Sequence, residues 1–195
     1  ANGGIVIDSD AATDVPGLYA CGEVTGGMHG ADRIGGLSSA NGLVFGEIAG
    51  KSAATEAGGT MAADDEILLR ARSIPDAHGI RSRLRSVMTE NAMIARSADG
   101  LTRAIRFCTD ALEEMERNAP ATTAADAAAA LRLSAQLRTA MAVLTAALLR
   151  RESRGAHYRT DYPDTLKSEE KRIIVTETNG AITARHESSE ERTHE

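Results

Sequence analysis

Glycine is distributed unevenly along this chain, and that asymmetry constrains its fold more than any other feature. Of the 18 glycines among 195 residues, 14 lie in residues 1–60. The same segment has two basic residues against seven acidic ones, so it carries most of the net charge of -6. Glycine allows tight turns and close backbone contacts, whereas the alanine that is abundant in the remainder favours helices. The sequence therefore predicts two different architectures within one chain.

The first segment combines short apolar runs, a glycine-rich stretch and one helical pattern. The apolar runs at 3–8 and 18–21 each predict a short strand. Residues 25–37 lack periodicity and are rich in glycine, which predicts a loop that approaches another group closely. Apolar residues recur at helical spacing over 39–56, and Ser38 or the serine after it is expected to cap this helix.

The rest of the chain predicts a bundle of helices and one hairpin. Acidic residues at 64–66 are expected to open a short helix, and 78–97 form an amphipathic one. Asp99 is expected to cap the next helix, and a long fourth helix spans about 123–153. Helices of this kind, joined by short loops, form a bundle. An Asn-Gly pair at the centre of 173–183 predicts a β-hairpin.

Composition argues against several function classes. Aromatic residues make up 3% and tryptophan is absent, so stacking of nucleic-acid bases on aromatic side chains is not expected. The net charge of -6 also argues against a nucleic-acid backbone as partner. Cys21 and Cys108 lie far apart without CxxC partners, so no metal site is expected. We expect neither a membrane span nor a secretory signal, because no apolar run has the required length or position.

Two runs in the first segment carry the chemical information. They are Gly-Leu-Tyr-Ala-Cys-Gly-Glu-Val at 17–24 and His-Gly-Ala-Asp-Arg-Ile-Gly-Gly at 29–36. In open α/β sheets, ligands bind beyond the carboxyl ends of strands, and a helix start offers unpaired N–H groups with partial positive charge. Arg33 could form a bidentate contact with a carboxylate. The pattern favours a cofactor or anion site, and a glycine-rich turn that packs a helix on a strand is the open alternative.

These runs resemble the flavoprotein subunits of succinate dehydrogenase and fumarate reductase, and also L-aspartate oxidase. That family carries Gly-Leu-Tyr-Ala-x-Gly-Glu, then His-Gly-Ala-Asn-Arg-Leu, then a serine-containing helix start with Val-Phe-Gly. A further run at 151–163, Arg-Glu-Ser-Arg-Gly-Ala-His-Tyr-Arg-Thr-Asp-Tyr-Pro, is similar to the signature that follows the family's C-terminal helical bundle. The resemblance covers residues 3–163.

The resemblance implies an α+β fold with three parts. Residues 1–60 would be the end of an FAD-binding α/β domain, and residues 61–163 a C-terminal helical bundle with its return segment. Residues 164–195 would be a polar tail with a short β-hairpin. The family's N-terminal phosphate loop, capping region, proton-donating arginine and a substrate-binding histidine have no counterpart here. The chain is therefore expected to be the C-terminal portion of a flavoenzyme, and inactive by itself.

The resemblance also implies roles for particular residues. Glu23 matches a glutamate that contacts FAD, and Ser38 and Ser39 match the helix-start pair that contacts the isoalloxazine. Arg33 matches the arginine that binds a substrate carboxylate, and Gly36 matches a position beside the substrate. No catalytic residue and no metal ligand are assigned within the chain.

Two residues depart from the family pattern. Asp32 and Leu37 each replace an asparagine of the family. A carboxylate at Asp32, next to Arg33, would partly neutralise the guanidinium and weaken its hold on a dicarboxylate.

The activity implied is that of an FAD-dependent oxidoreductase, which passes hydride between the flavin and the carbon–carbon bond of a dicarboxylate. The implied partners are this dicarboxylate, the missing N-terminal FAD-binding and capping regions, and an iron–sulfur electron-transfer subunit. The implied location is cytoplasmic, peripheral at the cytoplasmic membrane face through partner subunits. Two alternatives stay open, namely an L-aspartate oxidase and a non-catalytic helical interaction module.

Polar residues outside these motifs have structural roles by expectation. Arg154, His157 and Arg159 are expected to bond the last carbonyl groups of the long helix and to dock the bundle onto the flavin domain. Residues 150–152 are expected to form a solvated helix end. For His29, a backbone-bonding or exposed loop position is favoured over a role as acid or base.

Overall fold

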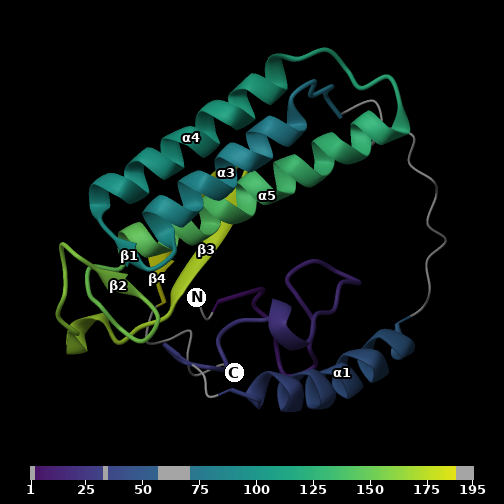
Figure 1. The fold of residues 1–195 in the computed structure, drawn as a ribbon. Helices are drawn as coiled ribbons and strands as arrows, with labels where there is room; N and C mark the ends of the chain where they lie inside the picture. The colour runs from purple at the N-terminus through teal and green to yellow at the C-terminus, as the bar shows by residue number, and fades with distance from the viewer. Residues whose placement is uncertain (1–2, 33–34, 57–70, 188–195) are drawn as a thin grey trace. The chain divides into compact units, whose positions relative to one another are not determined.

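The computed structural model describes residues 3–32, 35–56 and 71–187 (Figure 1). Two compact units are present. The first comprises Ala1–Met61, Arg154–Ala156 and Glu187–Glu195, and the second comprises Ala62–Ser153 and His157–His186. The described residues form four α-helices and two small two-stranded sheets, so the fold is mixed α+β.

The first unit contains the 3-10 helix η1 (Gly22–Val24) and the helix α1 (Leu37–Thr55). The predicted serine cap of α1 is wrong, because Gly36 is the N-cap and both serines lie inside the first turn. Gly36 has φ 92, a left-handed conformation that glycine adopts without strain. The helix therefore begins two residues earlier than a side-chain cap would place it.

The two strands predicted in the first unit are reduced to single bridges in the described residues. Ile5 pairs with Thr25 in a parallel bridge, and Ala12 pairs with Tyr19 in an antiparallel one. The carboxylate of Asp8 accepts the N–H groups of Asp10 and Ala12, both at 2.9 Å, so the first run folds into a side-chain-stabilised turn. This local turn ends the ladder before a strand can form.

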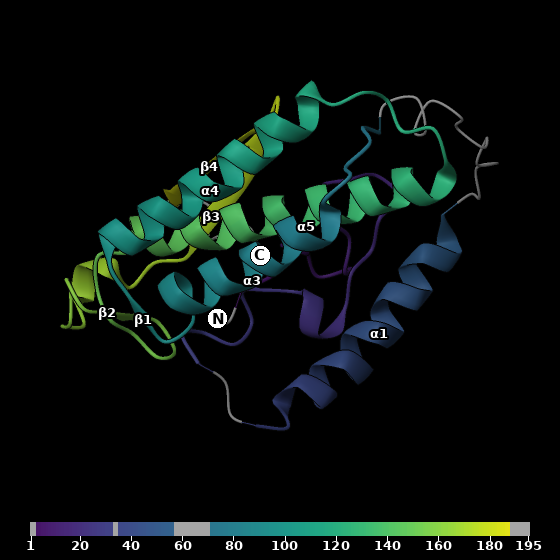
Figure 2. The same ribbon diagram turned by 45° about the horizontal axis from the view of Figure 1, so that its top comes forward.

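The second unit is built on three packed helices, α3 (Ala77–Ala92), α4 (Ala98–Arg117) and α5 (Ala124–Leu149). They run side by side in Figures 1 and 2. Their buried faces carry aliphatic residues at helical spacing, which confirms the helical periodicity of the sequence. Buried members of this core on the three helices include Ile80, Leu84, Leu101, Cys108, Met115, Leu133, Leu137 and Leu144.

Each helix of the second unit begins at a polar cap. Asp76, Ser97 and Thr123 accept the N–H group three residues on, at 3.1, 3.2 and 3.1 Å. The prediction of Asp99 as a cap is wrong, because Ser97 has the extended backbone that a cap requires and Asp99 lies in the first turn. The short helix predicted to open at 64–66 lies outside the described residues.

Two sheets complete the second unit. Strand β1 (Ala95–Arg96) runs parallel to β2 (Tyr158–Arg159). Strands β3 (Ile173–Thr178) and β4 (Ala181–His186) form an antiparallel hairpin that packs on α5, as Figure 1 shows. Asn179 and Gly180 join them with φ 51 and 81, the left-handed pair of a type I′ turn. The predicted hairpin is confirmed, and a second 3-10 helix, η2 (Lys167–Glu169), precedes it.

Candidate functional site

Three of the predicted site residues gather at the start of α1 in the first unit. Gly36 caps the helix, and Ser38 and Ser39 occupy its first turn, where the Ser39 N–H donates to the Gly36 carbonyl at 3.0 Å. Ser38 is half-buried and Ser39 is exposed. Glu23 is exposed on η1, which packs against α1. Arg33 lies outside the described residues.

Glycine brings η1 close to α1. Gly22 has φ 77, and a Cβ added to it would lie 3.7 Å from the Cα of Gly42 on α1. One turn further along α1, a Cβ on Gly46 would lie 4.0 Å from the Sγ of Cys21. The face of α1 toward η1 therefore lacks side chains, which lets the turn with Glu23 lie directly against the helix.

A second glycine contact holds the start of the loop that follows η1. The Ile5 N–H donates to the Val24 carbonyl at 2.8 Å, and the Gly26 N–H donates to the Ile5 carbonyl at 3.0 Å. A Cβ on Gly26 would lie 2.5 Å from the nitrogen of Gly4, so the two backbones cross at a distance that only glycine permits. The start of the glycine-rich loop is therefore held in place against residues 4 and 5.

Asn41 is a functional candidate that sequence reasoning missed. Its side chain is buried on α1, with Nδ2 3.2 Å from Nε2 of His29 and 3.6 Å from Sδ of Met28. Its Oδ1 is buried and has no hydrogen-bond partner in the described residues. A buried unpaired acceptor costs about 1–3 kcal/mol, so it indicates a donor that the described residues do not provide. An amide within an apolar helical pattern was the signal that could have revealed it.

The start of α1 suits an anion or a polarised carbonyl. No described side chain caps it, so the N–H groups of the first turn keep their partial positive charge. A Cβ added to Gly35 or Gly36 would meet no atom of the described residues within 4 Å, so these residues leave this end of the helix open. The partial positive charge of a helix start without a side-chain cap is typical of a site that binds an anion.

Residues 154–156, which follow α5 in the chain and belong to the first unit, contact the glycine-rich loop. Gly155 has φ 56, and a Cβ on it would lie 2.7 Å from the carbonyl carbon of Ala31 and 3.1 Å from the Ala31 Cβ. The carbonyl oxygen of Ala31 would be closer still. The backbone at Gly155 therefore lies against the His-Gly-Ala-Asp loop at 29–32.

Within the second unit, Arg159 bonds the last carbonyl groups of the long helix, as expected, whereas docking of the bundle onto the flavin domain stays a prediction. Its side chain is 1% exposed, and Nη1 donates to three carbonyl oxygens at the end of α5, at 2.9 to 3.3 Å. Its Nε and Nη2 donate to the two carboxylate oxygens of Asp161, each at 2.8 Å. Asp161 also accepts the N–H of Ala98, the first residue of α4, at 2.8 Å. These bonds, led by those from Arg159, hold the pKa of Asp161 well below its usual range.

The surroundings of His157 favour its neutral form. Nη1 of the buried Arg96 lies 2.8 Å from Nδ1 of His157, so Nδ1 accepts and the proton of the neutral ring sits on Nε2. Burial, followed by the charge of Arg96, lowers the pKa of His157 to about 4. Nε2 is buried without a hydrogen-bond partner in the described residues.

The expected solvated helix end at 150–152 is wrong for two of its three residues. Glu152 is fully buried, and its carboxylate accepts Nη1 of Arg150 at 2.9 Å and the N–H of Leu166 at 2.8 Å. Arg150 is half-buried, whereas Arg151 is exposed. The buried acid ties the end of α5 to a segment 14 residues further along the chain.

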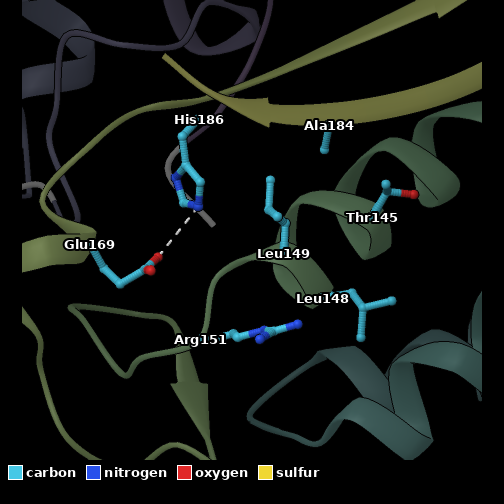
Figure 3. A pocket seen from close by; sticks show the side chains of 7 residues that line it. All are labelled: Thr145, Leu148, Leu149, Arg151, Glu169, Ala184 and His186. Carbon is cyan, nitrogen blue, oxygen red and sulfur yellow. Dashed lines mark ion pairs between the residues drawn. The ribbon is translucent and has the colours of Figure 1, made fainter. Parts of the chain in front are cut away.

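A separate hollow of about 440 Å³ lies in the second unit, at the end of α5 (Figure 3). The carboxylate of Glu169 points toward the ring of His186, with 3.6 Å between Oε2 and Nε2. No predicted site residue belongs to it. Its lining residues are Thr145, Leu148, Leu149, Arg151, Glu169, Ala184 and His186.

Two further properties hold for the described part of the chain. It contains no cluster of three or more histidine, cysteine, aspartate or glutamate side chains that could hold a metal ion. None of its helices combines the length and the apolar character needed to cross a membrane.

Comparison with known families gives two matches. The profile described as "Fumarate reductase flavoprotein C-term" matches residues 81–189, which is more than half of the chain. The profile described as "FAD binding domain" matches residues 1–39, which contain η1 and the whole glycine-rich stretch at 25–37.

Individual proteins are similar over most of the chain. An uncharacterized FAD-dependent oxidoreductase of Methanocaldococcus jannaschii is 37% identical, covering 89% of this chain and 34% of that protein. An L-aspartate oxidase of Mycobacterium leprae is 37% identical, covering 89% of this chain and 31% of that protein. A quinol fumarate reductase structure from E. coli superposes with a TM-score of 0.77 at 26% identity, covering 94% of this chain and 35% of that chain. The chain thus spans about one third of the length of these proteins.

Proposed function

Because the chain belongs to the fumarate reductase flavoprotein family, we propose that it is the C-terminal part of an FAD-dependent oxidoreductase. The proposed reaction is hydride transfer at the carbon–carbon bond of a dicarboxylate, as between succinate and fumarate. One observation carries the proposal beyond family membership. The start of α1 has no side-chain cap among the described residues, and Ser38 and Ser39, two of the three predicted cofactor residues, lie in its first turn. The same helix holds the Asn41 oxygen, for which the described residues provide no hydrogen-bond partner.

The residues of the first unit fit a flavin. When bound, FAD supplies the hydride chemistry, and its ring system becomes more negative on reduction. Glu23, Ser38 and Ser39 are the residues we propose to hold it. The N–H groups at the start of α1 would stabilise the negative charge, because the helix N-terminus carries partial positive charge. The Asn41 oxygen, which has no hydrogen-bond partner in the described part of the chain, would accept a donor from the cofactor or from a bound water.

We assign substrate binding to Arg33 and Gly36. An arginine binds a carboxylate through two parallel N–H donors, and a glycine leaves room for the substrate beside the helix start. This assignment rests on the match of the His-Gly-Ala-Asp-Arg run to the family pattern. Asp32 differs from the family asparagine and is expected to moderate the affinity for dicarboxylates.

The two profile matches support a proposed organisation of the whole protein, whose boundaries come from the sequence pattern. Residues 1–60 would complete an FAD-binding domain, 61–163 would form the helical bundle domain with its return segment, and 164–195 would form the tail. Further FAD-binding and capping regions would come from outside this chain. Partner subunits, including an iron–sulfur electron-transfer subunit, would hold the cytoplasmic protein at the membrane face.

The experiment that tests this function compares two arginine variants of the native protein that contains this chain. Purified protein is examined for the visible absorption of a flavin, and for viologen-dependent fumarate reduction and dye-dependent succinate oxidation. In Arg33→Met, kcat/KM for fumarate should fall by about 100-fold, since removing the partner of a bound carboxylate costs about 3 kcal/mol. Arg106→Met is the matched control, because Arg106 is exposed on α4 in the second unit.

The alternatives give different results in the same experiment. Oxygen-dependent oxidation of L-aspartate without fumarate reductase activity would identify an L-aspartate oxidase, which the relative from Mycobacterium leprae favours as second candidate. A native protein without flavin would overturn the proposal and leave the helical interaction module. Equal kinetics for Arg33→Met and Arg106→Met would remove Arg33 from the substrate site.

A further inference from the structure

The contact between Gly155 and Ala31 connects the run at 151–163 with the glycine-rich loop. We propose that Gly155 is a positioning residue, which braces the loop at 29–32 through its backbone contact with Ala31 and thereby supports the affinity for a dicarboxylate. The proposal rests on the function proposed above. It assigns a role in substrate affinity to Gly155, although Gly155 lies more than 120 residues from the loop at 29–32 in sequence.

The described part of the loop is held at two points. His29 contacts Asn41 of α1, with 3.2 Å between Nε2 and Nδ2. Ala31 lies against the backbone of Gly155, as the position of an added Cβ shows. Between them, Gly30 takes φ 59, a conformation that allows the chain to reverse direction from one contact to the other. Only Asp32 separates the second contact from Arg33.

Two features of residue 155 require glycine. Its φ of 56 is left-handed, which disfavours any residue with a Cβ. Its added Cβ would also lie 2.7 Å from the carbonyl carbon of Ala31, a distance at which one of the two backbones must move. The neighbour is backbone rather than a flexible side chain, so the displacement passes directly into the loop.

The expected consequence is specific to the substrate. A shift of about 1 Å in a binding group can reduce catalytic efficiency by about 100-fold when alignment is critical. The cofactor residues Glu23, Ser38 and Ser39 lie on η1 and α1, outside this loop. A clash at residue 155 should therefore weaken dicarboxylate binding while flavin content stays close to normal.

Gly180 provides a matched control for the backbone strain. It has φ 81 and lies in the turn between β3 and β4, and a Cβ added there would meet no atom within 4 Å. Gly180→Ala thus introduces a Cβ at a left-handed residue without a clash. The difference between Gly155→Ala and Gly180→Ala isolates the contact with Ala31.

The test uses the native flavin-containing protein and two independent readouts. The first is the dissociation constant of malonate, an unreactive dicarboxylate, followed through the absorption of the flavin. The second is amide hydrogen exchange of the peptide covering 27–32. For Gly155→Ala we expect malonate affinity to fall at least tenfold, KM for fumarate to rise likewise, and exchange in the loop to accelerate. Gly180→Ala should leave all three quantities within about twofold of the parent.

A double variant keeps the test decisive if Gly155→Ala folds poorly. Ala31→Gly removes the Ala31 Cβ, which lies 3.1 Å from the added Cβ, and lets the loop backbone yield. Gly155→Ala combined with Ala31→Gly should recover part of the malonate affinity, a coupling that independent sites do not give.

The two proposals fail in different ways. Unchanged malonate affinity and unchanged loop exchange in Gly155→Ala would overturn the bracing role while the proposed function stands. Faster loop exchange in a parent protein that binds neither flavin nor malonate would overturn the proposed function, and with it the substrate role of Gly155. Equal loss of flavin and malonate binding would mean that Gly155 supports the whole unit, which also contradicts the proposal.

Discussion

Arg159 satisfies the ends of two helices with one ion pair. Its guanidinium donates to the carbonyl end of α5, while its partner Asp161 accepts the N–H of Ala98 at the start of α4. A cation at a helix C-terminus and an anion at an N-terminus are the arrangement that helix dipoles favour. The Arg159 guanidinium also lies 5.0 Å from the ring centre of Tyr162, at cation–π distance. The buried charge of Arg159 is tolerated because each of its three guanidinium nitrogens has a hydrogen-bond partner.

His157 gives a prediction on the pH dependence of stability. Its pKa is about 4 in the folded protein against 6.5 for an ordinary histidine, so the unfolded chain binds more protons within this window. The free energy of unfolding should therefore decrease as the pH falls from 6.5 to 4, by up to about 3 kcal/mol. His157→Gln keeps an acceptor for Arg96 but does not titrate, so its stability should depend less on pH. Urea denaturation at both pH values measures the difference.

The comparison is between slopes rather than absolute stabilities, because other groups titrate as well. The parent protein and His157→Gln share those other groups. Identical losses of stability in the two proteins between neutral and acidic pH would show that His157 is not the titrating group.

At the scale of elements, the sequence predicted what local patterns determine. Helical periodicity located α5 to within a few residues, and the Asn-Gly pair located the hairpin turn. The helix predicted over 78–97 was too long, because α3 ends at Ala92 and Ala95–Arg96 form β1. Helix starts were less accurate, since Ser97 rather than Asp99 caps α4 and a cap depends on backbone angles that side-chain type does not specify. The burial of Glu152 was missed because its acceptor role depends on the N–H of Leu166, on a segment that folds back.

Helix α5 allows a prediction on the packing of the bundle. Leu137 is fully buried, whereas Leu131 on the same helix is 47% exposed. Leu137→Ala should lower the free energy of unfolding by about 2–5 kcal/mol, because it removes buried methyl groups and leaves a cavity. Leu131→Ala is the matched control and should cost less than about 1 kcal/mol. Chemical denaturation followed by circular dichroism measures both, and equal costs would contradict the buried face assigned here.

At the scale of the whole molecule, the two units are not continuous stretches of the chain. Residues 154–156 belong to the first unit, whereas the chain on either side of them belongs to the second. The candidate site was only partly predictable for this reason. Glu23, Ser38 and Ser39 come from one continuous stretch that a motif can identify, but the approach of Gly155 to Ala31 joins distant parts of the chain.

Because the chain forms two compact units, we expect a core substitution in one unit to shift the thermal transition of that unit more than that of the other. Leu101 is fully buried in the helical core of the second unit, so Leu101→Ala should lower the temperature at which helical circular dichroism is lost in the native protein. Release of flavin reports on the first unit and should shift less. Thermal scans that record both signals test this, and equal shifts of the two transitions would indicate a single cooperative structure.

The burial of Glu152 and Arg159 also restricts where the polypeptide can be divided. Both side chains bond groups on α5 or its end to chain that follows Leu149. A fragment that ended with the last helix would lose the donors and acceptors that satisfy its terminus, and would leave ionised groups without partners. Expression boundaries, affinity tags and fusion partners are therefore best placed after residue 187, beyond the hairpin, rather than after the helix where periodicity alone would suggest a cut.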